Sequence, residues 1–243
     1  METDLDSLLE TYISDLRPGV SSAPWVMLNM ISSKNGVATL NGTSGPLGGP
    51  VDKALFRTLR GLADVILVAA GTVRTENYSV PAISDRTTQI RASQNRSHLP
   101  TITVVTNSLN LDPESPLFSS SDYRPAILTS KTGFNEGTLS LFKNIDTFQI
   151  GESLVDLKEA IPTLAEAYGP VILVEGGPNL NQQLVDLDLF DEFCITVSPR
   201  YSSDPRSQLV TTAESYQTGE VILDRELTVG DFTFQRFLRK RSL

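Results

Sequence analysis

The sequence predicts an α/β fold with a central, mostly parallel sheet that is flanked by helices. Apolar strand candidates alternate with helical patterns through most of the chain, and several of these strands are apolar throughout. Strands that are buried on both faces have this continuous apolar character, which is typical of parallel sheets covered by helices. The strand candidate at residues 231–240 instead alternates apolar and polar residues, which indicates antiparallel strands at the C-terminal end.

The first half of the chain begins with an amphipathic helix at residues 4–16, inside an N-terminal extension of residues 1–20. A strand is expected at residues 24–31, a helix at 51–63 and a buried strand at 64–71. The following segment, residues 72–100, is mostly polar. Polar segments of this length without structure of their own are functional lids or disordered insertions, so a long loop is predicted here.

The second half of the chain continues the alternation. Strands are expected at residues 101–107, 124–130, 145–151, 170–178, 192–200 and 231–240, and helices at 153–169 and 179–192. Ser153 is a candidate cap of the first of these helices, and Pro162 should kink it or force it to restart. No repeat or linker divides the chain, so one domain is expected over residues 1–243, with its core at 24–240.

Composition excludes several classes of function. The chain has 243 residues and a net charge of -9, so its surface lacks the basic stripe that nucleic-acid binding needs. One cysteine, Cys194, and one histidine, His98, make a zinc site unexpected, and Cys194 lies in an apolar run typical of a buried thiol. No apolar run reaches the roughly 18 residues of a membrane span, and the acidic N-terminus does not resemble a signal peptide. We therefore expect a cytoplasmic protein with no membrane partner.

Three polar or glycine-rich loops follow strand candidates or precede a helix. They read "GTSG" at residues 42–45, "AGTVRTEN" at 70–77 and "EGGP" at 175–178. Ligands of open α/β sheets bind beyond the carboxyl ends of the strands. The three loops are therefore expected to meet in one crevice.

Each candidate residue in these loops has a functional and a structural interpretation. Gly176 and Gly177 can present backbone amides to a phosphate at a helix N-terminus, or can simply make a tight turn. Glu175 ends an apolar strand and needs a donor, which a ligand or a buried salt bridge can supply. Thr72 can bind a ligand phosphate or cap a helix, and Glu76 can orient an amine or be a solvated charge.

Arg60 can be a ligand contact or a cation favoured by the C-terminus of its helix.

The order of four segments resembles the pyrimidine reductases of riboflavin biosynthesis. The segments are "PWVMLNMISSKNG", "GTSG", "FRTLRGLADVILVAAGTVRTE" and "VILVEGGPNLNQQLVDLDLFDEFCITVSP". These correspond to the C-terminal reductase half of the bacterial bifunctional deaminase-reductase and have a dihydrofolate-reductase-like fold. The resemblance covers about residues 24 to 199. The zinc-deaminase motifs are absent, so the chain resembles a stand-alone reductase.

The resemblance implies an NADPH-dependent enzyme, commonly a homodimer, that reduces the ribosylamino group of a phosphorylated pyrimidine to a ribitylamino group. The pyrimidine can be the diamino compound or its deaminated uracil form, and the sequence does not choose between them. The implied catalytic or orienting residues are Glu175 and Glu76. The implied substrate contacts are Ser44, Arg60 and Asn29. The implied cofactor contacts are Gly71, Thr72, Gly176, Gly177, Pro178, Asn179 and Leu180.

The chain departs from the family pattern at three places. Asn35 replaces a usual aspartate, Asn29 replaces a lysine of the bifunctional enzymes, and residues 48–50 read "GGP" in place of "WIT". A related reductase with another heteroaromatic or pterin-like substrate therefore remains an alternative. A non-catalytic NADP-binding protein is a second alternative, which predicts binding without turnover.

Overall fold

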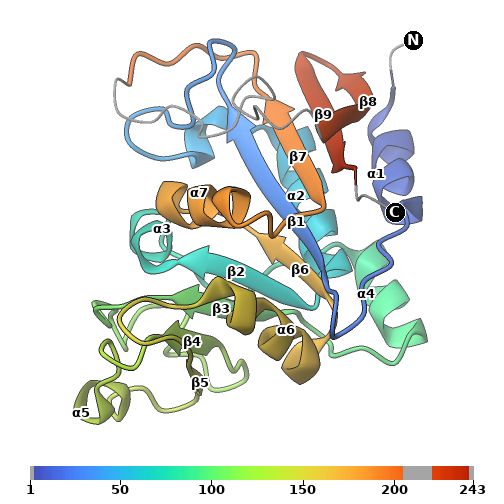
Figure 1. The fold of residues 1–243 in the computed structure, drawn as a ribbon. Helices are drawn as coiled ribbons and strands as arrows, with labels where there is room; N and C mark the ends of the chain where they lie inside the picture. The colour runs from blue at the N-terminus through green and yellow to red at the C-terminus, as the bar shows by residue number, and fades with distance from the viewer. Residues whose placement is uncertain (1–2, 205–220, 241–243) are drawn as a thin grey trace.

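The computed structural model describes residues 3–204 and 221–240, and the strands within them form one sheet in the order β5-β4-β3-β2-β6-β1-β7-β9-β8 (Figure 1). The strands are β1 (Trp25–Ser32), β2 (Val65–Ala69), β3 (Thr101–Val105), β4 (Ala126–Thr129), β5 (Asp146–Gln149), β6 (Val171–Val174), β7 (Glu192–Val197), β8 (Val221–Val229) and β9 (Phe232–Arg239). Neighbours from β5 to β7 are parallel, and β9 is antiparallel to β7 and β8. The predicted α/β fold, with a mostly parallel sheet and antiparallel C-terminal strands, is confirmed.

Helices cover both faces of this sheet. They are α1 (Leu5–Ser14), α2 (Pro50–Leu62), α3 (Ala70–Thr75), α4 (Asp85–Ser93), α5 (Glu136–Leu139), α6 (Leu157–Tyr168) and α7 (Pro178–Asp186), with a 3-10 turn at Gly45–Leu47. None of the helices in the described ranges is both long and apolar enough to cross a membrane.

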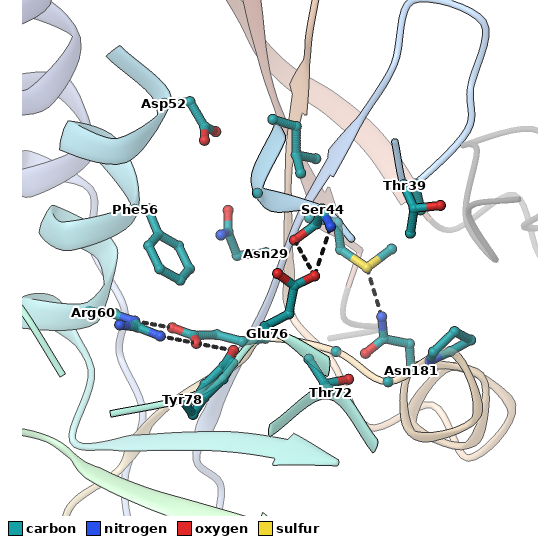
Figure 2. A pocket seen from close by; sticks show the side chains of 18 of the residues that line it. Asn29, Thr39, Ser44, Asp52, Phe56, Arg60, Thr72, Glu76, Tyr78 and Asn181 are labelled. Carbon is teal, nitrogen blue, oxygen red and sulfur yellow. Dashed lines mark hydrogen bonds and ion pairs between the residues drawn. The ribbon is translucent and has the colours of Figure 1, made fainter. Parts of the chain in front are cut away.

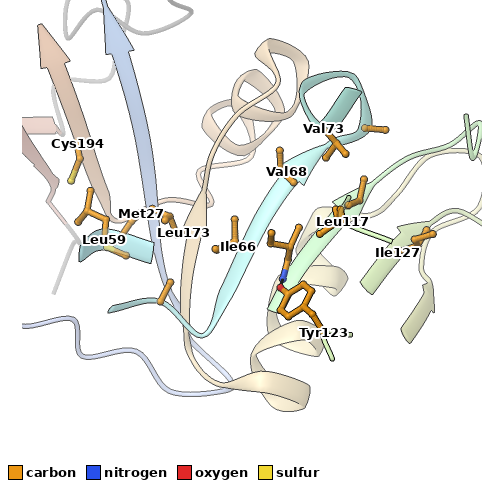
Figure 3. Packing of buried hydrophobic residues seen from close by; sticks show 14 of the residues in the cluster. Met27, Leu59, Ile66, Val68, Val73, Leu117, Tyr123, Ile127, Leu173 and Cys194 are labelled. Carbon is orange, nitrogen blue, oxygen red and sulfur yellow. Dashed lines mark hydrogen bonds between the residues drawn. The ribbon is translucent and has the colours of Figure 1, made fainter. Parts of the chain in front are cut away.

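The buried strands are apolar throughout because each contributes to two cores. Along β2, Ile66 and Val68 belong to the core under α1 and α2, whereas Val65 and Leu67 belong to the core under α6 and α7. Figure 3 shows part of the first core, where Ile66 lies near Leu173 of the neighbouring strand. Cys194 is buried in this core as expected, and burial and the neighbouring charge of Glu192 raise the pKa of its thiol.

The predicted N-terminal helix is confirmed as α1, which is an integral part of the fold. Leu8 and Tyr12 are buried in the core beside α2, whereas Leu16, beyond the helix, is 85% exposed. Asp4 begins the helix by accepting a hydrogen bond from the Ser7 amide (2.7 Å). Leu8 and Tyr12 are therefore committed to the core and not available to a subunit interface.

A closed cluster of charges joins the segment after α1 to β7 and β9. Its members, named here the Glu192 cluster, are Arg17, Trp25, Glu192 and Arg236. The Glu192 carboxylate is fully buried and accepts hydrogen bonds from Arg17 (2.8 and 3.0 Å), Trp25 (2.9 Å) and Arg236 (2.8 Å). Burial by itself raises the pKa of Glu192, but the two arginines lower it to about 2. The carboxylate therefore remains charged although no solvent reaches it.

The long loop predicted at residues 72–100 is wrong, because this segment contains the end of α3 and the whole of α4. Helix α4 has no clear apolar stripe. Its N-cap is Ser84, whose side chain accepts a hydrogen bond from the Thr87 amide (3.3 Å). Its anchor is the buried Arg91, which donates to the carbonyl groups of Gly61, Ala63 and Ser97. A helix that is held by a buried arginine leaves no hydrophobic period in the sequence.

Other boundaries also differ from prediction. Helix α6 begins at Leu157 with Asp156 as its cap, not Ser153, and it runs through Pro162 without restarting. The strand β8 was not predicted. Residues 205–220, which fall inside the predicted core, and residues 1–2 and 241–243 lie outside the described part of the chain.

Candidate active site

A cavity of about 460 Å³ opens at one edge of the sheet. The strands β2, β6 and β1 are parallel neighbours, so the segments that follow them meet at the same edge. Nine of the residues predicted for the site line the cavity: Asn29, Ser44, Arg60, Thr72, Glu76, Glu175, Gly176, Gly177 and Pro178. The predicted meeting of the three loops is confirmed.

Arg60 and Glu175 both line the cavity and form a two-pronged ion pair. Figure 2 shows Arg60 and the dashed lines of its bonds. The Nε and Nη2 atoms of Arg60 donate to the two oxygens of Glu175, both at 2.6 Å. The phenol of Tyr78 donates to the same carboxylate at 2.7 Å. We call these three residues the Glu175 cluster. Arg60 is thus more than a cation at a helix end, since it holds a carboxylate 115 residues away in sequence.

Aromatic rings fix the guanidinium of Arg60. Its central carbon lies 4.2 Å from the ring centre of Phe56 and 5.4 Å from that of Tyr78. Burial tends to lower the pKa of Arg60, but the charge of Glu175 raises it overall. Burial and Glu175 together raise the pKa of Tyr78 well above its ordinary value. The phenol therefore keeps its proton and continues to donate to Glu175 at neutral pH.

Glu76 and Ser44 form a second pair in the cavity. The Ser44 amide and hydroxyl donate to Oε1 of Glu76 at 2.7 and 2.9 Å. Glu76 follows directly after α3, and Ser44 precedes the 3-10 turn at Gly45–Leu47. Glu76 is therefore a positioned carboxylate in the cavity, and the interpretation of Glu76 as a solvated charge is wrong.

The glycine segment after β6 both makes a tight turn and leads into a helix N-terminus that can bind an anion. Gly176 and Gly177 have φ values of +99° and +95°, which favour glycine. A Cβ on Gly177 would lie 2.4 Å from the Cβ of Ala69, so the turn must be tight. The same segment leads into the N-terminus of α7, where free amides and the helix dipole favour an anion.

Thr72 is the third residue of α3 and lines the cavity, so its interpretation as a helix cap is wrong; Ala69 occupies the cap position. Three predicted cofactor residues do not line the cavity: Gly71, Asn179 and Leu180. Leu180 is buried in the core, so its side chain is unavailable to a ligand. What Leu180 offers is its backbone amide in the first turn of α7.

The cavity residues that the sequence analysis did not single out include Asp52, Phe56, Tyr78 and Asn181. Asn181 is buried, and its Nδ2 donates to the sulfur of Met30 at 2.7 Å. Its Oδ1 has no hydrogen-bond partner among the described residues. A buried carbonyl without a donor is costly, so this oxygen is suited to accept from a bound ligand. The sequence did contain a signal for Asn181, since an asparagine stands one helical turn after Gly177, where α7 begins.

The described residues hold no group of histidine, cysteine and acidic side chains suited to a metal ion. The cavity instead provides a glycine-led helix start, an amide oxygen without a donor, and two carboxylates held by defined partners. These groups fit a dinucleotide phosphate and a small polar substrate side by side.

Comparison with known proteins identifies the class of fold first. Dihydrofolate reductase from Enterococcus faecalis, complexed with NADP(H), matches with a TM-score of 0.51 at 11% identity, covering 92% of this chain and 99% of that one. The riboflavin biosynthesis reductase Rib7 of Saccharomyces cerevisiae matches with a TM-score of 0.70 at 19% identity, covering 98% and 100%. The predicted dihydrofolate-reductase-like fold is therefore confirmed.

The family is identified by sequence. The RibD C-terminal domain family matches residues 24–224, so the chain belongs to this family, and the resemblance predicted from the motifs is confirmed. A pyrimidine reductase-like protein from Corynebacterium diphtheriae matches with a TM-score of 0.80 at 27% identity, covering 96% of this chain and 99% of that one. A search of curated proteins found no match.

Proposed function

We propose that this protein is an NADPH-dependent reductase of riboflavin biosynthesis that converts the ribosylamino group of a phosphorylated aminopyrimidine to a ribitylamino group. Membership of the RibD C-terminal domain family supports the reaction class. The single observation that carries the proposal is one cavity containing both the glycine segment after β6 and the Arg60–Glu175 pair. The first suits a cofactor phosphate, and the second suits a polar substrate.

NADPH supplies the hydride when bound, and the glycine side of the cavity is where we place it. Gly176, Gly177 and the first amides of α7 would face the cofactor phosphates, with Thr72 beside them. The Asn181 oxygen would accept a hydrogen bond from a cofactor or substrate N–H. These contacts orient the reacting carbon and exclude water from it, which is the protein's part in hydride transfer.

The opposite wall would hold the pyrimidine and its ribose phosphate. Arg60 and Lys53 are the cations that line the cavity, and either can contact the phosphate. Asn29, Ser44 and Glu76 would hydrogen-bond the sugar or ring substituents. Glu175 would orient the sugar through the groups that it fixes. Positioning of this kind contributes strongly to rate because the reacting atoms must approach closely.

The test is turnover by the purified protein. We expect loss of NADPH absorbance with the diamino pyrimidine phosphate or with its deaminated form, and much slower reaction with NADH. The two pyrimidines are assayed separately, because the preferred one identifies the substrate. Protection from heat by NADPH, measured in parallel, tests cofactor binding without turnover.

The departures at Asn29 and residues 48–50 favour one second candidate, a reductase of another heteroaromatic or pterin-like substrate. Turnover of a pterin but of neither pyrimidine would select it. Binding of NADPH without turnover of any substrate would select a non-catalytic role. We further propose that the protein is cytoplasmic and forms a homodimer. Light scattering of the purified protein tests the homodimer.

A further inference from the structure

The two glutamates of the cavity are engaged by donors. Glu175 accepts three hydrogen bonds, two from Arg60 and one from Tyr78. Glu76 accepts two from Ser44. All of these bonds are donated to the carboxylates. An ionised carboxylate can accept at both oxygens, whereas a protonated one has an O–H group on one oxygen and accepts fewer bonds. Both oxygens of Glu175 are thus occupied by donors, and Ser44 fixes Oε1 of Glu76, so both glutamates are held in positioning contacts.

A third acid in the cavity, Asp52, has a different environment. It is the third residue of α2, is half-buried and lines the cavity. In Figure 2 its carboxyl group points from the helix toward the space beside Asn29. The side chain of Thr196 on β7 is near enough to favour its ionised form. The carboxyl therefore lies on the wall across from the glycine segment, where we place the substrate.

The local sequence makes room for this carboxyl group. A Cβ on Gly48 would lie 2.6 Å from Oδ2 of Asp52, so a larger residue at position 48 would displace the acid. Gly48 belongs to the "GGP" segment, one of the departures from the family pattern. The glycine and the aspartate are therefore structurally coupled.

Burial raises the pKa of Asp52, and the side chain of Thr196 and the charge of Lys53 lower it less. Lys53 neighbours Asp52 on α2, and Arg60 lies two turns further along the same helix. Across the cavity are Glu76 and Glu175. A raised pKa lets a carboxyl group retain its proton nearer to neutral pH, as a general acid requires.

We propose that Asp52 is the proton donor that opens the sugar ring of the substrate. This inference rests on the proposed function. The proton passes from Asp52 to the ring oxygen O4' as the C1'–O4' bond breaks, and the electron pair of the amine nitrogen forms a C1'=N bond. Bound NADPH would supply the hydride that C1' takes up, and solvent returns a proton to Asp52. Each turnover consumes one NADPH and one proton, so atoms and charge balance.

The first test is Asp52→Asn, which keeps the shape and removes the proton. We expect kcat to fall by about 100-fold or more, with NADPH affinity, measured by fluorescence titration, unchanged. The kcat of the parent enzyme should decrease as pH rises through the pKa of Asp52, and this dependence should disappear in the variant. A raised KM with unchanged kcat would mean that Asp52 only recognises the substrate, which overturns the proposal.

Two further variants check the assignment of this pH dependence. Thr196→Val removes a hydroxyl group that favours the carboxylate, and Lys53→Met removes a neighbouring positive charge. Both changes should move the decrease in kcat to higher pH, because both interactions favour the ionised form. A decrease that stays in place in both variants belongs to another group and contradicts the proposal.

A direct titration provides a readout that does not depend on activity. Carbon-13 labelling of the aspartate side chains, with Asp52→Asn used to assign the signal, should show Asp52 titrating above ordinary aspartates. A signal that titrates in the ordinary range contradicts the proposal. If the parent turns over neither pyrimidine, the proposed function fails and this step fails with it. If the parent is active and Asp52→Asn is equally active, only the role of Asp52 is wrong.

Discussion

Two clusters of this molecule use the same chemistry in different surroundings. Glu175 and Glu192 each accept a pair of hydrogen bonds from one arginine, and each accepts a further hydrogen bond from an aromatic side chain. The Glu192 cluster is closed inside the fold, with a second arginine, whereas the Glu175 cluster forms the wall of a cavity. An ion pair therefore does not mark a functional site unless it borders space for a ligand.

The largest expected effect is on stability at the Glu192 cluster. Glu192→Gln should lower the free energy of unfolding by about 3 kcal/mol, because it removes the buried charge that Arg17 and Arg236 share and leaves them only Asp15 and Asp224 as acidic partners. Denaturant unfolding measures the loss. Glu152→Gln is the matched control, since the pair of Glu152 and Lys131 is exposed to solvent and should contribute little to stability. Equal effects of the two substitutions would remove the contrast between closed and exposed pairs.

Acid should weaken the Glu192 cluster over a defined pH range. The pKa of Glu192 in the folded protein is about 2, below its ordinary 4.5. Since the folded value is the lower one, its contribution is complete above about 4.5 and is lost as pH falls toward 2. The stability difference between parent and Glu192→Gln should therefore shrink over this range in urea titrations. A difference that stays constant down to pH 2 would show that Glu192 is not held as an anion.

Compared with Glu192→Gln, Glu175→Gln should have a smaller effect on stability and act mainly on turnover. We expect about 1–3 kcal/mol lower stability, since solvent in the cavity can reach Arg60. Turnover should fall by about 100-fold or more, while NADPH affinity is kept. Steady-state kinetics measure turnover, and cofactor titration measures the affinity for NADPH. Activity equal to that of the parent would make Glu175 a purely structural residue, like Glu192.

The smallest effect is expected for Tyr78→Phe, which removes one donor from Glu175. The stability change should be about 0.5–1.5 kcal/mol, with a smaller loss of kcat than for Glu175→Gln. Tyr168→Phe is the control, because Tyr168 also donates to a carboxylate, that of Asp146, at 2.8 Å and does not line the cavity. Its turnover should equal that of the parent. A loss of turnover as large in the control would indicate a general effect on folding.

The sequence predicted the parts of the fold that depend on local pattern. The continuous apolar runs of β2 and β6 marked buried parallel strands, and the glycines after β6 marked a turn into a helix. Helix α4 was missed because its anchor is a buried arginine that bonds backbone carbonyl groups. The hydrophobic period registers apolar side chains and gives no signal for such an anchor.

For the site, the sequence by itself determined which residue types stand in the loops at the edge of the sheet, and their order placed nine predicted residues on one cavity. Only the tertiary structure decided the partners of those residues. The bond from Arg60 to Glu175 spans 115 positions, and Tyr78 and Asp52 join the same cavity from segments without a motif. Hydrogen bonds and burial depend on distances in space, which the chain sets only when strands β1, β2 and β6 lie side by side.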